Sequence, residues 1–186
     1  NHYVVTGAEQ PIIHLPDASY KWVAFSFNSN EAIDINAIID NDSKNLLPAA
    51  IANKDLIYTS GTVTTNGQNQ YLDIAFERMT NKVDFLIDVR GMFGRIDKAT
   101  RVSLKLKNGS TSTIVDAYVP SFNLLTGVTT AELGTSKFSL TSNSLNDVYE
   151  DESVMQASFH VYPAYIKVGE DITNANLTSN SLVLEI

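Results

Sequence analysis

The chain of 186 residues contains no cysteine and only three histidines, and charged residues make up 18% of it. The absence of cysteine excludes disulfides, thiol catalysis and thiolate metal sites. No apolar run reaches the roughly 20 residues that a membrane-spanning helix needs. Acidic residues outnumber basic ones by 21 to 13, giving a net charge of −8. That balance argues against nucleic acid or an anionic membrane surface as the partner of the whole molecule.

Short polar side chains take the place of the missing charge. Ser, Thr and Asn together supply 50 of the 186 residues, while hydrophobic residues stay at an ordinary 44%. The dominant hydrophobic period is two, which is typical of half-buried strands. It predicts strands over residues 22–27, 56–64, 72–77, 82–89, 101–107, 115–119, 137–140, 154–162 and 181–186. Turn signals such as Asn66-Gly67 and Asn108-Gly109 separate them.

Helical signals are few and short. Residues 32–40 place three isoleucines at roughly helical spacing, and Pro48 stands before a possible single turn over residues 49–53. Neither segment is long enough to anchor a fold. We therefore predict an all-β protein, an antiparallel β-sandwich with one or two short helices, forming a single domain over residues 1–186.

Metal ligands are sparse in the sequence. His2, His14 and His160 lie far apart along the chain. Residues 40–42 begin like a calcium-binding EF-hand loop, but Lys44, Asn45 and Ile51 stand where that loop requires an oxygen ligand, Gly and Glu. That motif is rejected, and we expect no metal and no cofactor.

Four acids gather near the start of one predicted strand. They are Asp147, Glu150, Asp151 and Glu152. The spacing leaves open a loose cation site or a solvated loop, and it favours the loop. No Gly-x-Ser-x-Gly turn exposes a nucleophile, and residues 91–94 lack the Lys and the helix of a phosphate-binding loop. We therefore predict no catalytic residues and no enzyme, and a hydrolase ranks last among the alternatives.

Aromatic side chains offer a second, binding function. Tyr20, Trp22 and Tyr58 lie on predicted strands, and Tyr162 and Tyr165 flank Pro163. Exposed in a row, such rings would make a carbohydrate-binding surface module. Aromatic residues on strands more often pack in the core or across strands.

The charges are unevenly distributed along the chain. Residues 78–107 hold eight of the 13 basic residues and three acidic ones, so this segment carries +5 and the remainder −13. One interpretation is a shared basic solvent face. The other is a dipolar subunit whose positive side meets the negative side of the next copy, which would build open head-to-tail chains.

Four segments, in this order, resemble a known family. They are Tyr20–Phe27, Asp55–Tyr58, Leu72–Ile87 and Phe159–Pro163. Together they are similar to the strand motifs of the fimbrillin-like proteins of Bacteroides-type bacteria, which include major and minor fimbrial subunits. The resemblance covers roughly residues 20–165 and consists of packing patterns.

The resemblance implies a transthyretin-like sandwich on the bacterial cell surface or outer membrane. In that family the precursor is exported with a lipid anchor, and subunits polymerise when a strand of one fills an apolar groove of another. The implied partners are other fimbrial subunits, further copies of the chain itself, or a host glycan or protein. The chain begins at Asn1 and not at Met, so we expect either a processed form or a shortened chain, and the strand-like run 182–186 points to a second domain that follows. We predict an open edge or groove beside the first long strand.

Overall fold

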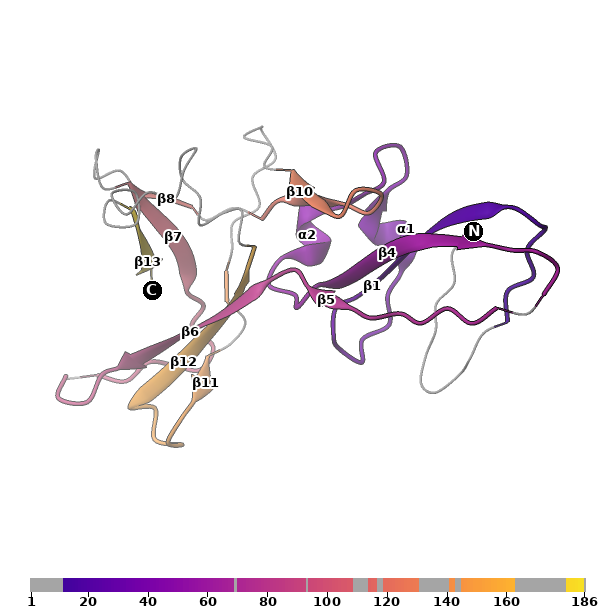
Figure 1. Ribbon diagram of the computed structural model, residues 1–186. Helices are drawn as coiled ribbons and strands as arrows, with labels where there is room; N and C mark the ends of the chain where they lie inside the picture. Colours follow the sequence, from indigo (N-terminus) through magenta and orange to yellow (C-terminus); the bar gives the residue numbers. More distant parts are fainter. Residues whose placement is uncertain are drawn as a thin grey trace.

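The computed structural model describes residues 12–68, 70–92, 94–108, 114–116, 119–130, 141–142, 145–162 and 180–185. Over these residues the fold is all-β, antiparallel and sandwich-like, as the sequence predicts. Two one-turn helices accompany the strands: α1 (Ile35–Ile38) and α2 (Pro48–Ile51). Figure 1 shows the arrangement of the elements.

The first sheet has the order β1–β4–β5. Strands β1 (Ser19–Ser26) and β4 (Ile57–Thr64) pair over eight residues each. Strand β5 (Glu77–Arg78) adds only two residues to the other edge of β4. The prediction of a strand over 72–77 is therefore wrong for all but its last residue, because residues 71–76 form no ladder with β4.

The second and third sheets supply most of the core. The second has the order β10–β9–β3–β2, with β2 (Ile39–Asp40), β3 (Asn45–Leu46), β9 (Ser121–Asn123) and β10 (Val128–Thr130). The third has the order β11–β12–β6, with β6 (Asn81–Asp88), β11 (Asn146–Asp147) and β12 (Val154–Val161). Strands β6 and β12 match the predicted strands closely, whereas β2, β3, β9, β10 and β11 are too short to show a period of two.

The fourth sheet has the order β13–β7–β8, with β7 (Ser103–Asn108), β8 (Ile114–Asp116) and β13 (Asn180–Glu185). These match the predicted strands 101–107, 115–119 and 181–186 to within a few residues. The predicted strand 137–140 lies outside the described residues. The helical prediction over 32–40 is right only at its centre, because Ile39 already pairs with Leu46 in β2 and β3.

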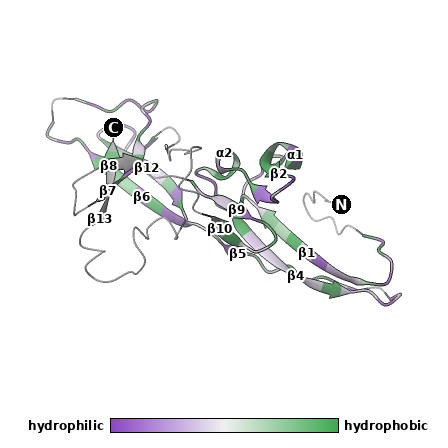
Figure 2. Ribbon diagram, turned by 90° about the horizontal axis from the view of Figure 1, so that it is seen from above, coloured by the Kyte–Doolittle hydropathy of each residue, from purple (hydrophilic) through white to green (hydrophobic). Residues whose placement is uncertain are grey.

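One hydrophobic core joins the four sheets. Its fully buried side chains include Leu46, Leu104, Phe122 and Phe159, one from each of the strands β3, β7, β9 and β12. The rings of Phe85 and Phe159 meet edge to face across β6 and β12, with centroids 5.9 Å apart. The β1–β4 pair contributes to this core near its base, through Tyr58, which is buried in it, and Phe25, which packs against it. The rest of that pair projects away from the core in both ribbon views (Figures 1 and 2).

Candidate assembly site

The outer half of the β1–β4 pair is a two-stranded ribbon. We define this ribbon as Ser19–Ala24 together with Thr59–Thr64, which are partners in the antiparallel register. None of these residues belongs to the buried core. A two-stranded sheet is only marginally stable in water, so such a ribbon gains from a further strand.

Both long edges of the ribbon lack a strand partner among the described residues. Strand β1 has β4 as its one neighbour, and β4 has β5 as a further neighbour only at Ile57 and Tyr58. Backbone N–H and C=O groups on an open edge are ready to pair with an incoming strand. The predicted open edge beside the first long strand is thus present in the described part of the chain.

A ring and a glycine organise one face of the ribbon. Trp22 pairs with Gly61 across the two strands, and its ring covers the glycine: a Cβ placed on Gly61 would stand 2.7 Å from Cζ2 of the ring. The indole Nε1 is buried and has no hydrogen-bond partner among the described residues. An isolated glycine within a strand pattern often marks such a close approach, so Gly61 was the sequence signal for this contact.

The tip of the ribbon is fastened by a group of hydrogen bonds. The Thr65 amide donates to the Ala18 carbonyl (2.9 Å), and the Thr65 hydroxyl donates to the Pro16 carbonyl (2.7 Å). The Gly67 amide, at φ +74°, donates to the Asp17 carboxylate (2.6 Å). The chain therefore bends at Gly67, within the predicted turn Asn66-Gly67, and this bend is fixed to the residues that precede β1.

A polar junction fixes the base of the ribbon to the third sheet. Asp55, just before β4, accepts from Asn28 (2.8 Å) and pairs with the Arg78 guanidinium (2.9 Å). Burial alone would raise the pKa of Asp55, but the hydrogen bonds from Asn28 and Arg78 outweigh it and lower the pKa. His160 of β12 lies with Nδ1 4.0 Å from the same carboxylate.

His160 is the histidine that the fold brings into this polar contact. Burial lowers its pKa, and the nearby Asp55 carboxylate opposes that effect. His14 is exposed, and His2 lies outside the described residues. Among the residues that the structure describes, no group of three or more His, Asp or Glu side chains gathers to hold a metal ion.

Carboxylates of the two acidic segments close turns. Asp40 accepts from the Ser43 hydroxyl (2.6 Å) and the Asp42 amide (3.1 Å), which forms the turn between β2 and β3. The side chain of Asp147 is 5% exposed and accepts from the Glu152 amide (3.1 Å), with the Lys98 ammonium 3.8 Å away. A positive side chain beside this carboxylate disfavours a metal ion there.

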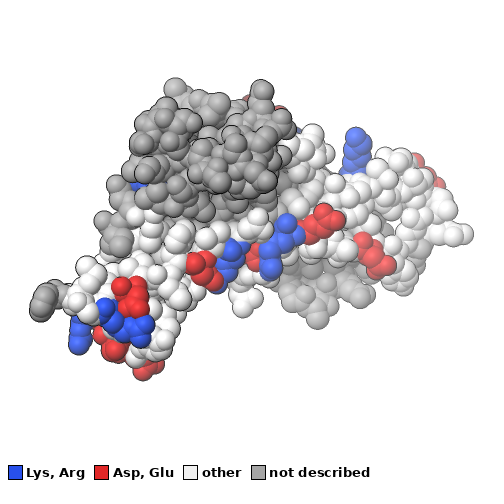
Figure 3. Space-filling view, turned by 60° about the vertical axis from the view of Figure 1, so that its left-hand side comes forward, with Lys and Arg blue, Asp and Glu red and all other residues white. Residues whose placement is uncertain are grey.

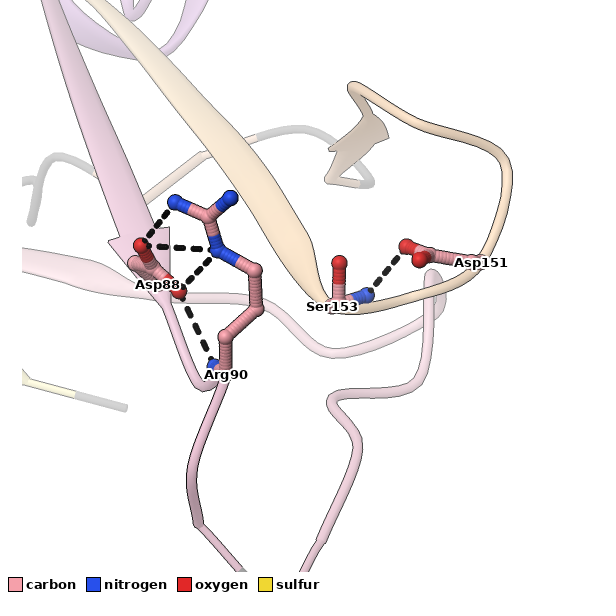
Figure 4. Close-up of polar contacts among 4 residues, drawn as sticks. All are labelled: Asp88, Arg90, Asp151 and Ser153. Carbon is pink, nitrogen blue, oxygen red and sulfur yellow. Dashed lines mark hydrogen bonds and ion pairs between the residues drawn. The ribbon is translucent and has the colours of Figure 1, made fainter.

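The end of β6 carries a compact ion pair (Figure 4). The Arg90 guanidinium donates to both oxygens of Asp88, and the Arg90 amide donates to Asp88 as well (2.9 Å). These hydrogen bonds lower the pKa of Asp88 to about 2. Arg90 also lies 5.7 Å from the centroid of the exposed Tyr149 ring, and Asp151 accepts from the Ser153 amide.

The basic segment 78–107 does not form a one-sign surface. Four of its eight cations, Arg78, Lys82, Arg90 and Lys98, each lie within 4.0 Å of a carboxylate. Figure 3 shows blue and red side chains intermixed on the face that it presents. Internal pairing therefore accounts for at least half of the positive charges of this segment, which favours a mixed solvent face over a dipolar docking surface.

Two of the five aromatic residues considered for a sugar-binding platform are buried in the core. Tyr58 and Tyr162 are 6% and 2% exposed. Tyr58 donates to the Leu124 carbonyl (2.7 Å), and Tyr20 donates to the Pro16 carbonyl (2.9 Å). Trp22 covers Gly61, while Tyr165 and Pro163 lie outside the described residues.

Comparison with protein-family models, curated proteins and solved structures finds no match for this chain. No helix in the described residues is long and apolar enough to cross a membrane.

Proposed function

We propose that the chain is a structural, non-enzymatic subunit of a cell-surface fimbria, which assembles by adding a strand of another subunit to the open β1–β4 ribbon. The observation that carries this proposal is the pairing of the ribbon. Eight residues of β1 pair with eight of β4, and two residues of β5 are the only further strand partners among the described residues. Strand addition supplies backbone hydrogen bonds along such an edge.

The surroundings of the ribbon support the same function. The ribbon projects from the core (Figure 1), so an incoming strand has access to it. Exposed apolar side chains lie on and beside it, among them Val23 at 38% and Ile74 at 45%. An added strand would bury part of this apolar surface, which is favourable by about 25 cal/mol per Å².

The resemblance to fimbrillin-like proteins supplies the biological setting of the proposal. It supports a bacterial cell-surface location, a lipid anchor in the precursor, and partners that are other fimbrial subunits or further copies of the chain. Adhesion to a host glycan or protein would be a property of the assembled fimbria. The buried or covered aromatic rings give the alternative of a carbohydrate-binding module no support of its own.

Sedimentation velocity over a concentration series tests the proposal. We expect the unaltered chain to form oligomers that grow with concentration. Val23→Lys places a charge on the edge strand and should weaken association by about tenfold or more. Leu125→Lys is the matched control, because Leu125 is 64% exposed in the turn between β9 and β10. A chain that stays monomeric, or equal effects of the two lysines, would overturn the proposal.

A further inference from the structure

Residues 71–76 form the unpaired arm of a hairpin whose other arm is β4. The arm begins after the anchored tip at Thr65 and Gly67 and ends at β5, which is paired with β4. Within the described part of the chain, no backbone hydrogen bond joins residues 71–76 to β4. The hairpin is thus closed at its base, fastened at its tip and open between them.

The pairing of β5 fixes the register in which this arm would continue. Ile57 faces Arg78 and Tyr58 faces Glu77. Because antiparallel partners step in opposite directions, the same register places Thr59 opposite Phe76 and Thr64 opposite Tyr71. No insertion or deletion is needed to complete an eight-residue strand.

The side-chain pattern of the arm fits that register. Opposite residues of an antiparallel pair point to the same face. Leu72, Ile74 and Phe76 would then face Val63, Gly61 and Thr59, on the side of the ribbon that carries Trp22. The intervening Asp73 and Ala75 would join Thr62 and Ser60, which are exposed. A strand with one apolar and one polar face results, and a one-residue slip would exchange the faces.

Gly61 gives this register a specific contact. Trp22 already extends over Gly61, where no side chain separates its ring from the far edge of β4. Ile74 is the residue opposite Gly61 in the continued register, and it is 45% exposed in the open arm. Closing the arm brings Ile74 against the Trp22 ring, so that Trp22, Gly61 and Ile74 form a row across the three strands.

We propose that residues 71–76 are a strap that closes onto the free edge of β4 in the register set by β5. The open arm leaves this edge free for an added strand, and the closed strap occupies it. Strap and added strand therefore compete for the same backbone groups. The inference that the strap closes depends only on the geometry of the hairpin. Its role in controlling assembly rests on the proposed function.

Disulfide trapping tests the closure, because the chain has no cysteine of its own. Thr62→Cys with Asp73→Cys places two thiols directly opposite each other on the polar face of the closed hairpin. Thr62→Cys with Leu72→Cys is the matched control, with the thiols on opposite faces. Under mild oxidation of dilute monomer, the first pair should crosslink roughly tenfold faster or more, because Cβ vectors that point apart cannot be bridged without backbone movement.

The strap would be overturned if the two cysteine pairs crosslink at equal rates. It would also be overturned if the first pair stays reduced in a variant that circular dichroism shows to be folded. In the unaltered chain, nuclear Overhauser contacts between Ile74 and the Trp22 indole protons should be present, and their absence would count equally against the strap.

The trapped variant also separates the two proposals. Loss of assembly after trapping supports both, while trapping without loss of assembly keeps the strap and contradicts β4 as an assembly edge.

Discussion

The ring of Trp22 occupies the space that a side chain at position 61 would need, since a Cβ on Gly61 would stand 2.7 Å from its Cζ2 atom. Large aromatic rings commonly cover a glycine on a neighbouring strand in this way. The contact holds β1 and β4 in register in the part of the ribbon that no core residue supports. It also makes the one tryptophan of the chain a reporter for the ribbon.

Gly61→Ala should displace the Trp22 ring and destabilise the fold. We expect the free energy of unfolding to fall by about 1–3 kcal/mol, the usual cost of overpacking. Urea denaturation followed by tryptophan fluorescence measures this. Gly94→Ala is the control, because no atom lies within 4 Å of a Cβ built there, and it should change stability by less than about 0.5 kcal/mol. Equal effects of the two substitutions would show that the Trp22 contact contributes nothing.

The side chain of Asn53 extends the edge of β12 beyond the short strand β11. It accepts from the His160 amide (2.8 Å) and donates to the Ser158 carbonyl (3.4 Å), while β11 pairs only with Met155 and Gln156. Asn53→Gly should cost about 1–3 kcal/mol, because both backbone groups lose their partner. Glycine suits the φ of +54° at this position, so backbone strain does not contribute.

Lys44→Gly is the matched control for this substitution, because Lys44 also has a left-handed φ, of +58°. We expect it to leave stability unchanged or slightly higher in thermal unfolding. If Asn53→Gly behaves like the control, the Asn53 side chain does not act as a substitute strand.

His160 should make stability dependent on pH near neutrality. Burial lowers the pKa of His160 in the folded chain below the ordinary 6.5 of the unfolded chain. At a pH between these two pKa values, the unfolded chain binds the proton and the folded chain does not. Stability is therefore full above pH 6.5 and falls as the pH drops toward the lower pKa of the folded state. The charged groups around it are Asp55, Arg78, Lys82 and Asp84.

Urea denaturation from pH 5 to pH 8 measures this dependence. His160→Gln should reduce the loss of stability below pH 6.5, whereas His14→Gln, at an exposed position, should leave it as in the unaltered chain. An unaltered pH profile in His160→Gln would contradict the assignment of the effect to this residue.

Arg90→Ala should raise the pKa of Asp88 from about 2 toward its ordinary value of 3.8. The shift should be incomplete, because the backbone amide at position 90 still donates to the carboxylate. Because the pKa of Asp88 is lower in the folded chain, the ion pair stabilises the fold at pH values above 3.8, the ordinary pKa. This contribution is lost as the pH falls toward 2. The pair is exposed, so its effect on stability at neutral pH should be small. Titration of the Asp88 carboxyl carbon by NMR measures the change, and an unchanged pKa would contradict the role of the guanidinium.

The long strands were predictable because their alternation of apolar and polar residues is strong. Strand β6 illustrates this, since Val83, Phe85 and Ile87 pack against the core while Leu86 stays 66% exposed. Strands of two or three residues, such as β9, are too short for a period to appear. They form because tertiary packing buries residues such as Phe122.

The segment 71–76 shows where a sequence pattern and the structure differ. Its alternation is as regular as that of β6, yet it forms no ladder with β4 in the open arm, where Leu72, Ile74 and Phe76 stay 44%, 45% and 44% exposed. A period of two indicates that a segment is able to form a strand. Whether the strand forms depends on the surface available to it. The transthyretin-like topology and the single domain remain predictions.

Hydrogen exchange of the assembled chain, compared with the monomer, tests the central claim most directly. Strand addition at the ribbon predicts slower exchange on assembly at the amides of β1 and of Thr59–Thr64, with little change in β12, which already has β6 along its whole length. Protection that appears in other strands while the ribbon amides exchange as in the monomer would contradict assembly through the β1–β4 ribbon.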